Sequence, residues 1–91
     1  MIDDRAVLER AADVRFRAVD DETVVIRQEA AEALVLNEVA GRILELVDGR
    51  RTVGEIIDRL FEEFDAPRDA LAEDVCAYLR ELVAAGLVLG A

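Results

Sequence analysis

Apolar and polar residues alternate between Val14 and Arg27, which is the period-two pattern of β-strands. An acidic stretch at residues 20–22 interrupts the alternation and is typical of a turn, so the sequence predicts a β-hairpin. The hairpin face expected to be buried consists of Val14, Phe16, Ala18, Val24 and Ile26. The opposite face would carry Arg15, Arg17 and Arg27, which could attract an acidic peptide or form an ordinary solvated face.

A shorter apolar segment follows at residues 33–36 and reads Ala-Leu-Val-Leu. Its length of four residues suits an edge strand, and Leu34 and Leu36 would continue the buried face. Asn37 comes next, and its side-chain carbonyl can accept from the free amides of a helix's first turn. The sequence therefore predicts a strand that leads directly into a capped helix.

Apolar residues recur with helical spacing through the remainder of the chain. The first predicted helix begins after Asn37 and ends near Gly49, because glycine adopts the left-handed conformation of a helix C-terminus without a steric clash. The second spans residues 53–64, and Thr52 with Glu55 forms a capping box at its start.

A third helix is predicted over residues 67–85, since proline is favoured in a first turn and Gly86 is a stop signal. Its apolar face is wider than packing against two small helices requires, so part of that face would remain uncovered. The apolar tail at residues 87–89 could close over the core or add a brief strand.

Three short antiparallel strands followed by three helices make an α+β fold that is compatible with a winged helix-turn-helix. We expect residues 13–91 to form this single winged-helix domain. Residues 1–12 have modest apolar content and no clear period, so we expect a flexible lead-in that could pack Val7 and Leu8 against the domain.

Composition narrows the possible functions. The net charge of −10 would repel the negatively charged phosphate backbone of a nucleic acid, so no nucleic-acid partner is expected. The chain contains no His, no Ser and a single cysteine, Cys76, so it cannot build histidine-activated nucleophiles or zinc sites of His and Cys. Without Ser it also lacks the attachment residue of a phosphopantetheine carrier. We expect no cofactor and no metal.

The distribution of apolar residues also bears on location. The longest apolar runs are far shorter than a transmembrane helix, so no membrane partner is expected. The first residues are acidic and lack the apolar core of a secretory signal, which predicts a cytoplasmic protein.

The central stretch LNEVAGRILELVDGRRTVGEIIDRLFEEFDAP, followed by EDVCAYLRELVAAGLV, resembles the pyrroloquinoline quinone biosynthesis protein D-like (PqqD-like) family. The likeness covers residues 14–89 and depends on the order and spacing of its pieces. It implies a winged helix-turn-helix domain that binds the leader segment of a ribosomally made precursor peptide. The domain would present this peptide to a modifying enzyme, often a radical S-adenosylmethionine (radical SAM) enzyme.

An extended peptide can add itself as a strand to an exposed sheet edge. The residues expected to bind the leader are Ala33, Leu34, Val35 and Leu36 on that edge, and Leu71, Asp74, Val75, Tyr78 and Leu82 on the third helix. Core packing is the competing interpretation for Leu71, Val75 and Leu82, and Asp74 could have a local helix role instead. The Tyr78 hydroxyl needs water or a partner, which predicts a boundary position.

Two other classes of function stay open at this point. A DNA-binding winged helix would need basic residues on its reading helix, but the third helix sets Arg68 and Arg80 against four acidic residues. An enzyme would need convergent groups, whereas adjacent carboxylates such as Glu62 and Glu63 diverge on a helix. We therefore expect a peptide-binding adaptor without enzymatic activity, present as a monomer or weak homodimer.

Overall fold

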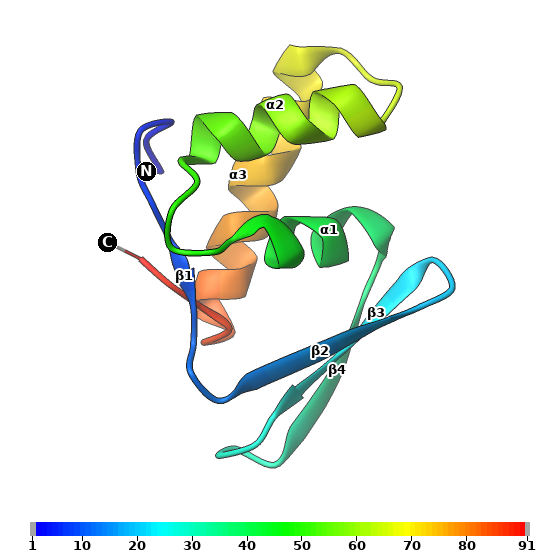
Figure 1. The fold of residues 1–91 in the computed structure, drawn as a ribbon, viewed down its shortest axis with the longest axis vertical. Coiled ribbons are helices and arrows are strands. Elements are labelled where there is room, and N and C mark those ends of the chain that lie inside the picture. The colour runs from blue at the N-terminus through cyan, green and yellow to red at the C-terminus, as the bar shows by residue number, and fades with distance from the viewer. Residues whose placement is uncertain (1, 91) are drawn as a thin grey trace.

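The computed structural model describes residues 2–90. Met1 of the predicted lead-in and Ala91 of the predicted domain therefore lie outside the described residues. The elements in chain order are β1 (Glu9–Arg10), β2 (Val14–Val19), β3 (Glu22–Arg27), β4 (Glu32–Leu36), α1 (Glu38–Leu46), α2 (Val53–Glu63), α3 (Arg68–Ala84) and β5 (Val88–Leu89). An antiparallel sheet of order β2-β3-β4 lies on one side of the three helices (Figure 1). The predicted α+β fold, with three antiparallel strands followed by three helices, is confirmed.

The helix ends follow the signals in the sequence. Asn37 caps α1, and its side chain accepts a 2.9 Å hydrogen bond from the amide of Ala40. Both halves of the Thr52–Glu55 capping box are present at the start of α2. Gly49 has a φ of +77°, which is the left-handed conformation predicted for the turn between α1 and α2.

The turn between β2 and β3 is shorter than the sequence suggested. Val19 pairs with Glu22, so only two residues connect the strands, whereas the sequence predicts a turn of three residues. Shortening a turn by one residue changes which residues of the second strand oppose those of the first. Phe16 consequently pairs with Val25, and these two side chains share one face of the sheet.

The predicted orientation of β3 is therefore wrong. Val25 is fully buried and Thr23 is 7% exposed, whereas Ile26 is 48% exposed on the opposite face. Val24 lies on that outer face with Ile26, and Arg27 turns to the inner face. The predicted cluster of three arginines on the outer face therefore reduces to the two on β2.

Residues of the predicted lead-in contact the helices and the C-terminal tail. β1 pairs antiparallel with β5, the brief strand considered for the tail (Figure 1). Leu8 is buried as expected, and Val7 forms an isolated β-bridge with Thr52. The amide of Gly54 also donates a 2.8 Å hydrogen bond to the carbonyl of Asp4. These contacts all come from residues on the N-terminal side of Val14.

One continuous core joins the inner face of the sheet to all three helices and to β5. Its largest fully buried side chains include Ile43, Leu44, Ile57, Leu60 and Leu79. Helix α1 approaches β3 so closely that a Cβ atom on Gly41 would lie 2.1 Å from Thr23 Oγ1. Within residues 2–90, no helix is long and apolar enough to cross a membrane.

Candidate functional site

A groove with a volume of about 330 Å³ runs between β4 and the C-terminal half of α3. The β4–α3 groove is lined by Leu34, Val35, Leu36, Asn37, Ala40, Tyr78, Glu81, Leu82, Ala85 and Leu87. Most of these side chains are apolar, and the polar ones are few. Such a lining suits the side chains of an extended peptide, with a small number of polar groups to fix its position.

Strand β4 forms one edge of the three-stranded sheet, as predicted. It pairs with β3 through residues 32–36, and no described strand pairs with its other side. Val35 is 62% exposed, the largest exposure among the large apolar residues described. The edge therefore offers backbone groups and an apolar side chain to an incoming strand.

The direction of the β4 amides follows from a hydrogen bond at the far side of β3. Gln28 directly follows β3, and its amide donates a 3.2 Å hydrogen bond to the carbonyl of Asp13, the residue before β2. The backbone amide of Gln28 therefore points toward β2. Amide directions alternate along a strand, which turns Thr23, Val25 and Arg27 toward β4.

The β4 residues that pair with Thr23, Val25 and Arg27 must direct their amides toward β3. These residues are Leu36, Leu34 and Glu32, respectively. Ala33 and Val35 are thus the β4 residues whose amides and carbonyls face the open edge.

Tyr78 and Asn37 join the two walls of the β4–α3 groove. The Asn37 side-chain amide donates a 2.9 Å hydrogen bond to the Tyr78 hydroxyl, while its carbonyl caps α1. Tyr78 is half-buried, as the boundary position predicted for it requires. This bond fixes the Tyr78 ring at the end of β4, where the strand passes into α1.

Arg27 joins the sheet to α3 at the opposite end of β4. Its Nη1 donates a 3.2 Å hydrogen bond to the carbonyl of Ala85, just beyond the last turn of α3. The same guanidinium lies 3.6 Å from Glu32 and 3.7 Å from Asp13. A cation is favourable at a helix C-terminus, so Arg27 helps to set the distance between β4 and α3.

The structure brings together most of the predicted site residues. Leu34, Val35, Leu36, Tyr78 and Leu82 all line the groove, and Ala33 lies on the same edge strand. Ala33 is exposed, and its backbone faces the open edge.

Three predicted residues of α3 lie elsewhere. Leu71 and Val75 are buried, at 4% and 0% exposure, and neither of them lines the groove, in agreement with the core-packing interpretation. Asp74 is exposed and does not line the groove. The uncovered part of α3 thus lies nearer its C-terminus than the sequence suggested.

Some groove residues were not predicted as part of the site. Glu81 and Ala85 follow Tyr78 at helical spacings of three and seven residues, so they share its face of α3. That spacing could have indicated that Glu81 and Ala85 line the same groove as Tyr78. Asn37 was predicted only as a cap, and nothing in the sequence indicates its second bond to Tyr78.

A second hollow, of about 210 Å³, lies between the β2–β3 turn and the facing surfaces of α1 and α2. Arg42 forms a two-bond ion pair with Glu63 there, at 2.7 and 2.6 Å, and also bonds to Glu45. The hydrogen bond from Arg42 holds the pKa of the Glu63 carboxyl below its ordinary value, and the pair raises the pKa of Arg42. Among residues 2–90, no three His, Cys, Asp or Glu side chains are grouped so that they could hold a metal ion.

Comparison with known proteins finds a family model and curated relatives that match most of the chain. The sequence model of coenzyme PQQ synthesis protein D (PqqD) matches residues 22–88. The PqqA binding protein of Gluconobacter oxydans (strain 621H) is 51% identical over 59 residues, which cover 65% of this chain and 62% of that protein. The PqqA binding protein of Bradyrhizobium diazoefficiens is 33% identical over 84 residues, which cover 92% of this chain and 80% of that protein.

Two solved structures have the same fold. The structure of TbiB1 in complex with the TbiA(beta) leader peptide superposes with a TM-score of 0.80 at 25% identity, covering 91% of this chain and 96% of that one. Lasso peptide synthetase B1, complexed with its leader peptide, gives a TM-score of 0.77 at 18% identity, covering 90% and 96% of the two chains. The match to the family's sequence model and the Bradyrhizobium relative show that this chain belongs to the coenzyme PQQ synthesis protein D family.

Proposed function

We propose that this protein is a non-catalytic adaptor that captures the leader segment of a ribosomally made precursor peptide and presents it to a modifying enzyme. The leader adds as a fourth strand beside β4, and its alternate side chains enter the β4–α3 groove. The relatives named as PqqA binding proteins and the TbiB1 complex with a leader peptide support this assignment. A radical SAM enzyme is the class of modifying enzyme that the family resemblance implies.

The observation that carries the proposal is the position of two open backbone groups beside an apolar groove. Ala33 and Val35 direct their amides and carbonyls away from β3, where only an added strand or water can pair with them. Backbone pairing gives affinity with little dependence on sequence, and the groove selects alternate side chains.

The groove lining indicates which side chains the leader would place there. Its walls are Leu34 and Leu36 on one side and Leu82 and Leu87 on the other, so large apolar side chains would bury the most surface. Glu81 stands on the same wall and is exposed. A basic leader residue at the rim would pair with it, although an exposed ion pair adds little affinity.

A titration of the protein with its cognate leader tests this proposal. The precursor is to be identified as a short reading frame beside the gene, and its leader synthesised as a free peptide. We expect a Kd in the micromolar to submicromolar range, about −8 to −9 kcal/mol, with amide chemical-shift changes concentrated in β4 and α3. A scrambled leader of equal composition is the control. No heat and no shift change at saturating leader would refute the adaptor function.

The structure does not favour the DNA-binding alternative. Arg68, at the start of α3, donates a 2.8 Å hydrogen bond to Asp58 of α2, so this cation is already paired. With a net charge of −10, the whole molecule repels a phosphate backbone. We therefore propose a peptide and not a nucleic acid as the ligand.

A further inference from the structure

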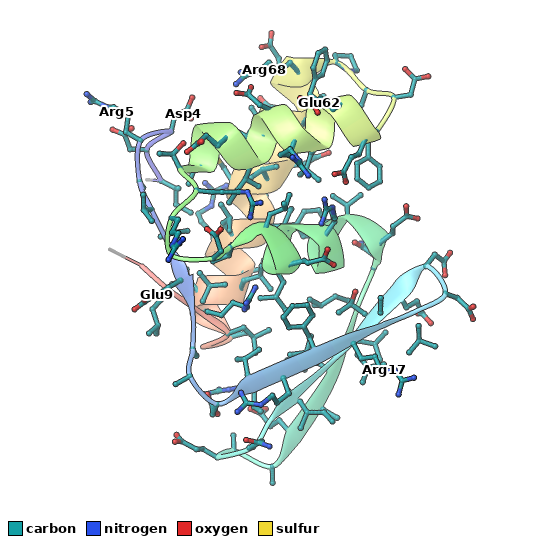
Figure 2. The ribbon with its side chains drawn as sticks, in the orientation of Figure 1. Asp4, Arg5, Glu9, Arg17, Glu62 and Arg68 are labelled. Carbon is teal, nitrogen blue, oxygen red and sulfur yellow. The ribbon has the colours of Figure 1, made fainter. Side chains whose placement is uncertain are left out.

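The outer face of the sheet, turned away from the helices, exposes apolar residues beside two arginines. The exposed fractions are 47% for Val19, 48% for Ile26 and 62% for Val35. The pairing register aligns Arg17 with Val24 and Val35 in one row across the three strands. Arg17 points away from the helical layer in Figure 2. We name this surface, made of Arg15, Arg17, Val19, Val24, Ile26 and Val35, the outer sheet face.

The cations of the outer sheet face have no acidic partner within the described residues. The chain has a net charge of −10, yet neither Arg15 nor Arg17 forms an ion pair within residues 2–90. Arg15 lies along the β2 edge, where its Nη1 donates to the carbonyls of Ala12 and Val14 at 3.1 and 3.0 Å. Of the acidic residues in the strands, the register places only Glu22 on this face. The outer sheet face therefore has an apolar centre with two arginines along β2, while its acids, Glu22 and the turn residues Asp20 and Asp21, lie at the end next to the β2–β3 turn.

The outer sheet face is continuous with the edge where we propose that the leader binds. Successive side chains of a strand point to opposite faces, so a leader on β4 would place every second side chain in the groove. The others would lie beside Val35 and extend the outer sheet face by one strand. A protein that contacts this face would meet the leader and adaptor together.

We infer that the outer sheet face is the docking surface for the modifying enzyme, through an apolar patch on the enzyme with an acidic rim. This inference rests on the adaptor function proposed above, because an enzyme that acts on the precursor must approach the bound leader. Complementary charge selects the partner and speeds the encounter. A second copy of this chain fits the face less well, since its own outer sheet face would bring two more arginines to the two already there.

The test compares two double variants of the full chain. The first, Arg17→Glu with Ile26→Thr, reverses the charge and makes the centre of the outer sheet face polar, while keeping a β-branched residue in β3. The matched control, Arg80→Glu with Val83→Thr, makes the same kinds of change on α3, where Val83 is 39% exposed and outside the β4–α3 groove. Arg17→Glu alone serves if the first double variant does not fold.

Three quantities are to be measured for each protein: the Kd for the modifying enzyme encoded beside the gene, the Kd for the free leader, and the sedimentation coefficient. We expect the Arg17→Glu, Ile26→Thr variant to bind the enzyme at least about tenfold more weakly, with leader affinity within about twofold of wild type. Enzyme binding by the wild type should also weaken as salt is raised. The control variant should match the wild type in every respect.

Unchanged enzyme affinity in the outer-face variant would overturn the inference while leaving the adaptor function in place. A wild-type dimer that this variant dissociates would also overturn it, because the face would then belong to a second copy. If the outer-face variant loses enzyme binding but the wild type does not bind the leader, the docking surface would stand and the adaptor function would fail.

Discussion

The side chain of Asn37 has two roles at once: its carbonyl caps α1, and its amide donates a 2.9 Å hydrogen bond to the Tyr78 hydroxyl on α3. The end of the edge strand, the start of α1 and a wall of the β4–α3 groove are thereby joined through one residue. The shape of the groove thus depends on a helix cap that is close to it.

Asn37→Ala should lower the free energy of unfolding by about 1–2 kcal/mol, because it removes both the cap and the bond to Tyr78. Asn37→Asp keeps an oxygen that can cap α1 and can accept from the Tyr78 hydroxyl, so its loss should be smaller. Urea denaturation of the two variants measures the difference. Equal stability of the Ala and Asp variants would show that the cap contributes nothing.

Tyr78→Ala should weaken leader binding by at least about tenfold, since it removes an aromatic wall of the groove and one of its polar groups. Its effect on stability should be smaller than that of a core truncation, because Tyr78 is only half-buried. Val83→Ala is the control, on the same helix but outside the groove. If the two variants bind the leader equally well, Tyr78 is not part of the binding surface.

Gly41→Ala should destabilise the fold by about 1–3 kcal/mol, because the new Cβ would lie 2.1 Å from Thr23 Oγ1 and force α1 away from β3. Adding Thr23→Ala removes the nearest clashing atom and should restore part of the lost stability. A double-mutant cycle measures this coupling between the two positions. Additive effects of the two substitutions would contradict the close approach.

The ion pair of Arg42 and Glu63 predicts a pH dependence. The pKa of Glu63 is lower in the folded protein than in the unfolded chain, so the stability that its ion pair contributes is fully present above the ordinary value of 4.5. That contribution is lost as the pH falls through the folded value. Glu63→Gln should therefore cost up to about 1 kcal/mol near neutral pH and almost nothing in strong acid.

Urea titrations of the Glu63→Gln protein at neutral and acidic pH check this prediction. Glu62→Gln is the matched control, because Glu62 forms no ion pair among the residues described. An equal destabilisation by Glu63→Gln at both pH values would exclude the charge of Glu63 as its cause.

Much of the fold could be predicted because its signals are local. The Asn37 cap, the Thr52–Glu55 capping box and the left-handed Gly49 each depend on residues within a few positions, and all three are present. The orientation of β3 could not be predicted reliably, because it depends on whether a turn of acidic residues contains two residues or three. A difference of one residue moved Val25 into the core and Ile26 to the surface.

The candidate site was predictable where it depends on the strand edge and less so where it depends on packing. Periodicity identified the short strand β4 and its inward leucines, but it cannot say which apolar residues of α3 the core will cover. Leu71 and Val75 are covered, while Leu82 also reaches the groove. The contact of Arg27 with the end of α3 joins residues 58 positions apart, and no local pattern indicates it.

Proline substitution in β4 tests the central claim, because proline removes one amide donor and leaves the rest of the strand unchanged. The amide of Val35 faces the open edge and that of Leu34 faces β3. Val35→Pro should therefore keep the fold, whereas Leu34→Pro should lose it, as judged by circular dichroism and melting. Val35→Thr, which keeps the amide and the β-branch, is the control for the lost side chain.

The decisive measurement is the leader Kd of folded Val35→Pro relative to that of Val35→Thr. Strand addition at β4 predicts that the proline variant binds at least about fivefold more weakly, the equivalent of about 1 kcal/mol for one lost backbone hydrogen bond. Equal leader affinity in the two folded variants would contradict strand addition at this edge.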